Sequence, residues 1–241
     1  MQAFAKTDIG KERKVNEDFY YISKPEDKIN LFILADGMGG YNAGEVASKM
    51  ATESVKDYIQ EHFEENKSTK EEIEELLRDA IEYANTVVYK KAQSKKDLNG
   101  MGTTLDVCLI YNSKIYIGHV GDSRVYRIRK NFMRKLTKDH SYVQTLIEDG
   151  KITKEEALTH PKRNMLTKAL GCTQKAEPDV YTKTFIKDDI ILMSSDGLTN
   201  MVKENDIYNI IRENKEHATE NLVRQANDNG GYDNITVVII M

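Results

Sequence analysis

Short apolar runs limit most strongly what this chain can fold into. Residues 31–35 and 190–193 contain no polar side chain, and residues 235–241 contain a single threonine. Runs of this length are typical of strands that are buried on both faces. Three further strands are predicted at residues 105–111, 115–120 and 125–128. Because a strand is buried on both faces only between two other layers, we expect each sheet to be covered on both sides.

Two amphipathic helices are predicted after the first of these strands. Apolar residues recur at steps of three and four between residues 46 and 63, and again between residues 73 and 88. Thr69 and Glu72 have the spacing of a capping box at the start of the second helix. Strands and helices do not alternate regularly along the chain, which disfavours a doubly wound parallel sheet. We therefore predict an α+β sandwich, in which two sheets cover each other and helices cover their outer faces.

The composition fits a single globular domain over residues 1–241, since no linker or repeat marks a boundary. The formal net charge of −4 and the pI near 5.8 argue against a protein that coats nucleic acid or an anionic membrane. The two cysteines, Cys108 and Cys172, exclude a disulfide scaffold and suit a reducing cytoplasm. The first residues lack the apolar stretch of a secretion signal, so we expect a cytoplasmic location.

Acidic residues stand beside glycines at the borders of the predicted strands. Asp36 and Asp196 are each followed by glycine, Asp122 follows a glycine, and Asp233 comes shortly after two glycines. A single Asp-Gly pair is ordinary turn chemistry. Four such sites beside apolar strands would crowd several anions together if they converge, and the anions would repel each other unless cations bind. Oxygen ligands of this kind suit Mg²⁺ or Mn²⁺.

Other motifs narrow the chemistry further. The histidines are scattered along the sequence and do not cluster with these acids, so a zinc hydrolase is not expected; they are His62, His119, His140, His160 and His217. Arg13 stands close to Glu17 and Asp18, which is either a surface charge cluster or a phosphate-binding cation beside two further acids. Nucleophile elbows, phosphate-binding loops and zinc-binding helix motifs are absent from the sequence. Hydrolysis by metal-activated water fits this inventory best.

Taken in order, these motifs resemble the metal-dependent protein phosphatases of the type-2C (PPM) family in its compact bacterial form. The resemblance covers essentially the whole chain, and each motif is weak alone while the ordered set is highly specific. The motifs are Thr7-Asp8-Ile9-Gly10, Arg13 to Asp18, Asp36-Gly37-Met38-Gly39-Gly40, Ala43-Gly44-Glu45, Gly102-Thr103-Thr104, Gly121-Asp122-Ser123-Arg124, Asp139-His140-Ser141, Ser195-Asp196-Gly197 and Gly231-Tyr232-Asp233-Asn234-Ile235-Thr236.

The resemblance implies a four-layer αββα sandwich of two antiparallel sheets flanked by helices. It also implies a site with two Mn²⁺ or Mg²⁺ ions. Asp36 would bridge the two ions, the Gly37 carbonyl would bind the first, and Asp196 and Asp233 would bind the second. Asp122, together with Asp196, corresponds to the acids that hold a third ion in bacterial members.

The resemblance assigns further roles outside these ligands. Glu17 and Asp18 would act on the metals through water, and Arg13 would bind the substrate phosphate. Many eukaryotic members carry a histidine where this chain has Met38, which cannot donate a proton, so a metal-bound water is expected to protonate the leaving group. Residues 138–171 resemble the small helical flap of bacterial members, with a predicted helix at residues 142–148.

The function implied is metal-dependent hydrolysis of phosphoserine and phosphothreonine in proteins, by attack of a metal-bridging water. The expected partners are phosphorylated proteins and a cognate serine/threonine kinase, with neither nucleic acid nor membrane, and the expected state is a monomer. The alternative is a catalytically weak pseudophosphatase that serves as a signalling binding module. Loss of a metal-binding acid would favour that alternative, and every expected acid is present.

Overall fold

The computed structural model describes residues 1–39, 43–64, 69–98 and 100–241, and their strands form two antiparallel sheets. What we call the β1 sheet has the order β1 (Ala3–Asp8), β11 (Ile235–Ile240), β10 (Ile190–Ser194), β7 (Arg124–Arg129) and β8 (Phe132–Lys135). The β2 sheet has the order β2 (Asp18–Ile22), β3 (Asn30–Met38), β5 (Leu105–Tyr111), β6 (Lys114–Val120) and β9 (Asp179–Thr184), and β4 (Gly102–Thr103) pairs with β3.

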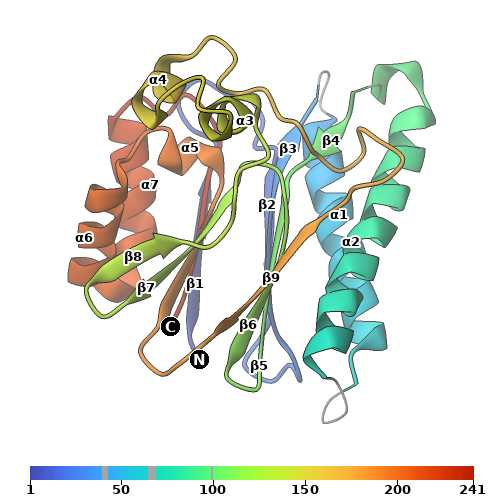
Figure 1. The fold of residues 1–241 in the computed structure, drawn as a ribbon, viewed down its shortest axis with the longest axis horizontal. Helices are drawn as coiled ribbons and strands as arrows, with labels where there is room; N and C mark the ends of the chain where they lie inside the picture. Colours follow the sequence, from blue (N-terminus) through green and yellow to red (C-terminus); the bar gives the residue numbers. More distant parts are fainter. Residues whose placement is uncertain (40–42, 65–68, 99) are drawn as a thin grey trace.

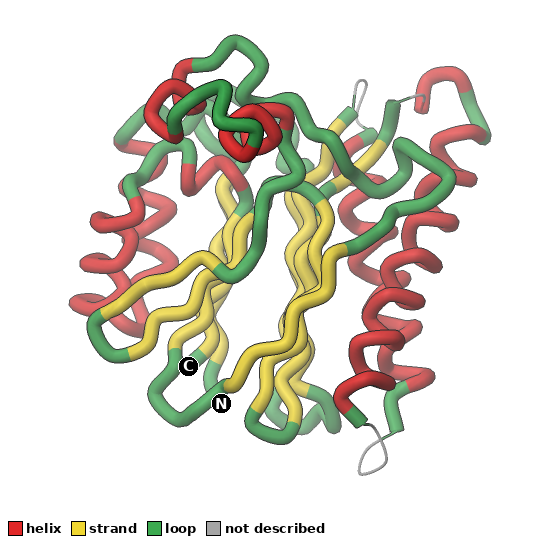
Figure 2. The backbone as a smooth tube through the Cα atoms, in the orientation of Figure 1, coloured by secondary structure: helices red, strands yellow, loops and turns green. Residues whose placement is uncertain are grey.

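The two sheets face each other and helices cover both outer faces, as Figures 1 and 2 show. Helices α1 (Gly44–His62) and α2 (Lys70–Gln93) cover the β2 sheet. The β1 sheet is covered by α5 (Asp196–Thr199), α6 (Glu204–Asn214) and α7 (Ala218–Asp228), and short 3₁₀ turns lie at Lys96–Leu98 and Lys215–His217. The predicted four-layer sandwich is therefore confirmed.

The apolar runs have the double burial that their composition predicts. In β3, Leu31 and Ile33 pack against the helices, while Phe32 and Leu34 lie in the layer between the sheets. In β11, Val237 and Ile239 similarly face the helices, and Val238 and Ile240 face the other sheet. Both faces of each inner strand are thus removed from water, which explains why these segments are almost purely apolar.

The strands that the sequence did not predict are mostly the outer ones. β1, β2, β8 and β9 are the first and last strands in the two sheet orders. Most of their residues are partly buried or exposed, so they carry mixed polar and apolar side chains. The prediction that the apolar strand ends at Ala35 is also wrong, because Gly37 and Met38 pair with β4 and extend β3 to Met38.

The segment between β8 and β9 lies across one end of the sandwich in Figure 1 and contains α3 (Tyr142–Glu148) and α4 (Lys154–Thr159). The predicted helix at residues 142–148 is confirmed. The capping box of α2 is confirmed at Thr69 and Glu72, and α4 begins with a second one, at Thr153 and Glu156. Within the described part of the chain, none of the helices combines the length and the apolar character required to cross a membrane.

Candidate metal centre

Asp18 and Asp36 lie side by side at one end of the β2 sheet. They are directly opposite each other in the antiparallel pairing of β2 with β3. The Asp18 side chain is buried, and its Oδ2 accepts a hydrogen bond of 2.8 Å from the Ser195 hydroxyl. Its Oδ1 is also buried and has no hydrogen-bond partner. A buried carboxylate oxygen without a donor is costly, so a cation or a water at this atom would stabilise the fold.

The backbone of Asp36 is fixed by two threonines at the end of β4, Thr103 and Thr104. The Asp36 amide donates to Thr104 Oγ1 at 2.9 Å, and the Thr104 amide donates to the Asp36 carbonyl at 2.8 Å. The Thr103 hydroxyl donates to the same carbonyl at 2.9 Å. None of these contacts uses the Asp36 carboxylate. The side chain is therefore positioned through its backbone and can serve as a ligand.

Three more acids reach this end of the sandwich from other elements. Asp196 is the first residue of α5, two residues after the end of β10, and Asp233 lies two residues before β11. Asp122 lies in the turn that connects β6 of one sheet with β7 of the other. Each side chain is half-buried. The site is thus assembled from both sheets, at the end where the predicted acids of the sequence converge.

The five carboxylates repel one another. Burial raises the pKa of Asp36 well above its usual value, and the charges of Asp18, Asp196, Asp122 and Asp233 raise it further. Burial, with a contribution from neighbouring acids, raises the pKa of Asp18 to about 7 and that of Asp196 to about 6. The same causes raise the pKa of Asp122 to about 8. Such a cluster binds cations because bound positive charge removes the repulsion.

Arg13 lies at the rim of this cluster. Its side chain is 47% exposed, and Nη2 donates to Asp233 Oδ2 at 2.7 Å. Burial lowers the pKa of Arg13, but the charges of Asp233, Glu17 and Asp36 outweigh this and the pKa is raised. The guanidinium is therefore a permanent cation that faces both the solvent and the acids, which suits a phosphate-binding group.

The side chain of Glu17, which precedes β2 in the sequence, lies against the N-terminus of α1. The backbone amide of Gly44 donates a hydrogen bond to its carboxylate there. Burial raises the pKa of Glu17, in spite of this bond. A Cβ atom at Gly44 would lie 2.6 Å from the Glu17 carboxylate, so a larger residue would displace this acid. The glycine in the Ala43-Gly44-Glu45 motif is thus required by the close approach of Glu17 to the helix.

Sequence reasoning gave no role to Ser195 and Asn234, which position the acids. The Ser195 hydroxyl donates to Asp18 and accepts a bond of 2.9 Å from the Thr236 amide, so it joins β2, β10 and β11. The Asn234 side chain accepts from the Glu17 amide at 2.8 Å and donates to the carbonyls of two residues in the N-terminal loop. Their only signal in the sequence was their place directly beside the predicted acids.

The arrangement fits divalent ions that keep part of their water shell. In the described part of the chain, no group of three histidine, cysteine or acidic side chains is already arranged to hold one ion. Carboxylate oxygens together with backbone carbonyls and water are the ligand set that Mg²⁺ and Mn²⁺ prefer. Asp18 Oδ1 and the mutually repelling acids are consistent with such ions. Gly40, the last residue of the Asp36 motif, lies outside the described residues.

The two histidines His119 and His140 lie together in the structure, although they are far apart in the sequence, and neither joins the cluster of five acids. The rings of His119 and His140 lie 4.8 Å apart, and each contacts an acid outside the cluster of five. Cys108 is buried and Cys172 is exposed, and both are free thiols.

Comparison with known proteins identifies the family to which this site belongs. A family model described as "Protein phosphatase 2C" matches residues 10–234. The chain belongs to the protein phosphatase 2C family. Members of this family are metal-dependent protein phosphatases. The resemblance predicted from the sequence is therefore confirmed.

Individual relatives agree with this assignment over nearly the full chain. The serine/threonine phosphatase stp of Listeria welshimeri is 41% identical over 242 residues, covering 100% of this chain and 95% of the relative. The solved structure of the serine/threonine phosphatase Stp1 from Staphylococcus aureus matches with a TM-score of 0.91 at 37% identity, covering 99% of this chain and 93% of that one. The catalytic domain of the phosphatase PstP, solved with two manganese ions, matches with a TM-score of 0.86 at 31% identity, covering 99% and 96%.

Proposed function

We propose that this protein is a metal-dependent serine/threonine phosphatase that hydrolyses phosphoserine and phosphothreonine in proteins. The observation that carries the proposal is the cluster of five mutually repelling carboxylates with the Arg13 guanidinium at its exposed rim. Family membership and the similarity to named serine/threonine phosphatases support it. The same comparisons favour the enzyme over a pseudophosphatase that only binds a partner.

The residues of the cluster would hold two ions. Asp36 would contact both, the Gly37 carbonyl would bind the first, and Asp196 and Asp233 would bind the second. Two manganese ions in the PstP structure support this number. Asp122 is the acid that could hold a third ion together with Asp196, and its pKa, raised by burial and by the neighbouring acids, supports a stabilising effect of positive charge there. Mn²⁺ and Mg²⁺ both suit these oxygen ligands.

The chain's own groups would orient the reactants. When bound, the ions supply a water that loses its proton near neutral pH and positive charge beside the phosphoryl oxygens. Glu17 and Asp18 would hold water molecules in place, since the Asp18 Oδ1 atom lacks a protein donor. Arg13 would bind two phosphoryl oxygens with its planar fork and oppose the charge that they carry in the transition state. Met38 has no proton to donate, so the departing serine or threonine oxygen would take its proton from water.

The setting of the enzyme is also part of the proposal. We infer that it acts as a monomer in the cytoplasm on phosphoproteins of a cognate serine/threonine kinase, without nucleic acid or membrane. The two free thiols support a reducing location. Residues 138–171, with α3 and α4, would form a flap beside the site within a single phosphatase domain of residues 1–241.

The decisive test is release of phosphate from a phosphothreonine peptide in the presence of Mn²⁺, Mg²⁺ or EDTA. We expect release with either ion and none with EDTA. The matched control is Asp189→Asn, which changes a buried acid far from the cluster and should remain active. A folded protein that releases no phosphate with any divalent ion would refute the proposal, and capture of a phosphoprotein partner would then favour the binding module.

A further inference from the structure

Asp106 and His119 form a polar pair in the otherwise apolar layer between the sheets. They are directly opposite each other on β5 and β6, and both side chains are completely buried. Two residues away on the same strand faces, Cys108 and Ile117 belong to the apolar core between the sheets. A buried ion pair is often no more stabilising than two apolar side chains in its place. Packing alone therefore does not account for this pair.

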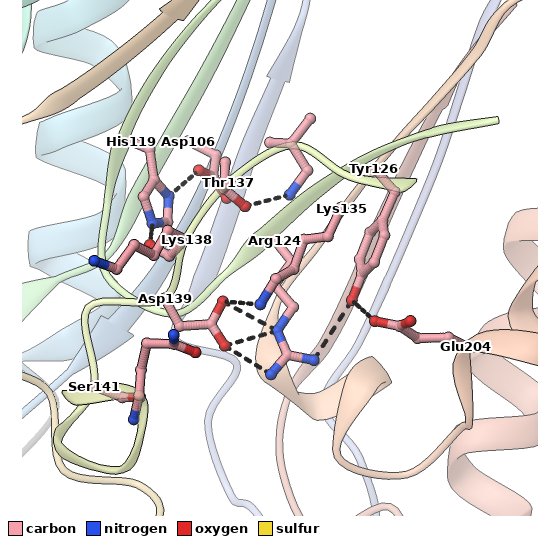
Figure 3. A network of polar contacts seen from close by, with 12 residues as sticks. Asp106, His119, Arg124, Tyr126, Lys135, Thr137, Lys138, Asp139, Ser141 and Glu204 are labelled. Atoms are coloured by element: carbon pink, nitrogen blue, oxygen red, sulfur yellow. Dashed lines mark hydrogen bonds and ion pairs between the residues drawn. The ribbon is translucent and has the colours of Figure 1, made fainter. Parts of the chain in front are cut away.

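Both ring nitrogens of His119 face hydrogen-bond acceptors, as Figure 3 shows. Nδ1 lies 2.6 Å from Asp106 Oδ1, and Nε2 lies 2.8 Å from the carbonyl oxygen of Lys138. A neutral imidazole has one N–H group and cannot donate to both acceptors, whereas an imidazolium can. Burial lowers the pKa of His119, but the charge and hydrogen bond of Asp106 outweigh burial, so that the pKa is raised.

His119 therefore holds the start of the segment that carries α3 and α4. We call residues 138–140 the strap. The second residue of the strap, Asp139, accepts hydrogen bonds from Arg124 at 2.8 and 3.0 Å. His119 and Arg124 stand on either side of the turn that carries Asp122. Two consecutive residues of the strap are thus bound by the two strands that flank this acid.

The third residue of the strap contacts the turn itself. The His140 amide donates to the Gly121 carbonyl at 2.7 Å, and the Gly121 amide donates to His140 Nδ1 at 3.1 Å. The His140 carbonyl in turn accepts a bond of 2.8 Å from the Thr167 amide, beyond α4. The strap therefore connects the backbone next to Asp122 with both ends of the helical segment.

We propose that His119 is a positioning residue, which as a buried imidazolium held by Asp106 fixes the Lys138 carbonyl and, through the strap, the turn that carries Asp122. The proposal rests on the proposed function, since Asp122 has a role only in the metal site. It links the charge of one buried histidine to the geometry of an acid that it does not touch. Loss of the ring proton leaves either Asp106 or the Lys138 carbonyl without its donor.

Other charged groups near His119 determine how its proton responds to pH. The anions favour the imidazolium, and the neighbouring ring of His140, which lies 4.8 Å away and whose own pKa burial lowers to about 4, stays neutral at pH 7. The titratable groups that face His119 or its ring neighbour are Asp106, Asp139, His140, Lys168, Asp179 and Tyr181. Strap contacts should therefore weaken as the pH rises through the raised pKa of His119.

The first test is nuclear magnetic resonance of the ¹⁵N-labelled histidine rings in the whole protein without metal. We expect two ring N–H protons on His119 at pH 7, with assignment from the His119→Phe change. A ring with one N–H proton at pH 7 would overturn the proposal. This measurement does not require turnover, so it remains decisive if the phosphatase assay fails.

The second test is hydrogen exchange in two variants. Asp106→Leu combined with His119→Phe replaces the pair by apolar side chains that suit the layer, so the protein should fold. We expect amide exchange in residues 138–142 to be at least tenfold faster than in the unsubstituted protein, with α1 unchanged. Asp106→Asn is the control, because its amide can donate to a neutral His119 that still donates to Lys138.

The pH dependence separates positioning from a merely structural role. In the unsubstituted protein, exchange at the strap should rise more steeply with pH than the intrinsic rate, and kcat/KM should fall over the same range. In Asp106→Asn both effects should be absent. Equal exchange rates at the strap in the double variant and the unsubstituted protein, or the same pH dependence in Asp106→Asn, would overturn the proposal. A protein without any phosphatase activity would refute the proposed function instead.

Discussion

Replacing Asp18 by asparagine should stabilise the metal-free protein at alkaline pH. Asparagine keeps an oxygen that accepts from Ser195 and removes a charge from the buried cluster. Burial raises the pKa of Asp18 to about 7 in the folded chain. The reference value in an unfolded chain is about 3.9, so the ionised side chain destabilises the fold by about 4 kcal/mol at pH 8. Because the five acids titrate together, about 4 kcal/mol is an upper limit for the gain in stability.

The sign of the effect follows from the raised pKa. The stability that a carboxyl group with a raised pKa contributes is fully present below its pKa in the unfolded chain. It is lost as the pH rises through its pKa in the folded chain. The gain from Asp18→Asn should therefore fall to about 0.5 kcal/mol at pH 4. For a chain of this length, about 4 kcal/mol at pH 8 corresponds to roughly 10 °C in Tm. Mn²⁺ should raise the Tm of the unsubstituted protein and raise that of the variant less.

The assay is thermal unfolding by circular dichroism in EDTA at pH 4, 6 and 8. Asp189→Asn is the matched control, because Asp189 is buried, accepts two bonds of 2.7 Å from Arg129, and has a lowered pKa. Burial raises the pKa of Asp189, but its bonds to Arg129 and a backbone amide outweigh burial, so this variant should be less stable at pH 8. A lower Tm for Asp18→Asn at pH 8, or an equal gain at pH 4 and pH 8, would refute the reasoning.

Three further changes test other parts of the site. Arg13→Ala should lower kcat/KM by roughly 100-fold while the Mn²⁺ dependence stays the same. The control variant Lys14→Ala should have little effect. Equal kcat/KM in both variants would remove Arg13 from the site. Asp36→Asn should leave a folded protein by circular dichroism but abolish phosphate release, and full activity would contradict the role proposed for Asp36 as a ligand of two ions. Gly44→Ala should destabilise the protein by about 1–3 kcal/mol in urea unfolding, because its Cβ would meet Glu17; unchanged stability would show that Glu17 can move away.

The inner strands could be predicted from the sequence, and the outer strands could not. Residues 105–111 were predicted with the bounds of β5, because both faces of that strand are buried and select apolar side chains. In β8, by contrast, Phe132 is 77% exposed and Arg134 is exposed, so burial does not select a run of apolar side chains in this strand. A strand at the edge of a sheet is defined by backbone pairing with one neighbour, which local composition does not record.

The candidate site shows a similar division. Asp36, Asp122, Asp196 and Asp233 could be named in advance because each stands beside or shortly after a glycine at the border of an apolar run. The pairing of Asp106 with His119 depends on the register of β5 with β6, in which a shift by one residue would place the two side chains on opposite faces. The spacing of the two residues along the chain does not reveal that register.

The division of the site between two sheets has a consequence for how activity arises during folding. Asp18 and its partner Ser195 are 177 residues apart in the sequence, and the Arg13–Asp233 pair spans 220 residues. Contacts of such long range form late and slowly, since much of the chain must already be ordered. A nascent chain on the ribosome cannot complete the cluster until Asp233 has emerged. A partly synthesised chain that lacks Asp233 therefore has an incomplete acid cluster and should carry no phosphatase activity that could act on the wrong proteins.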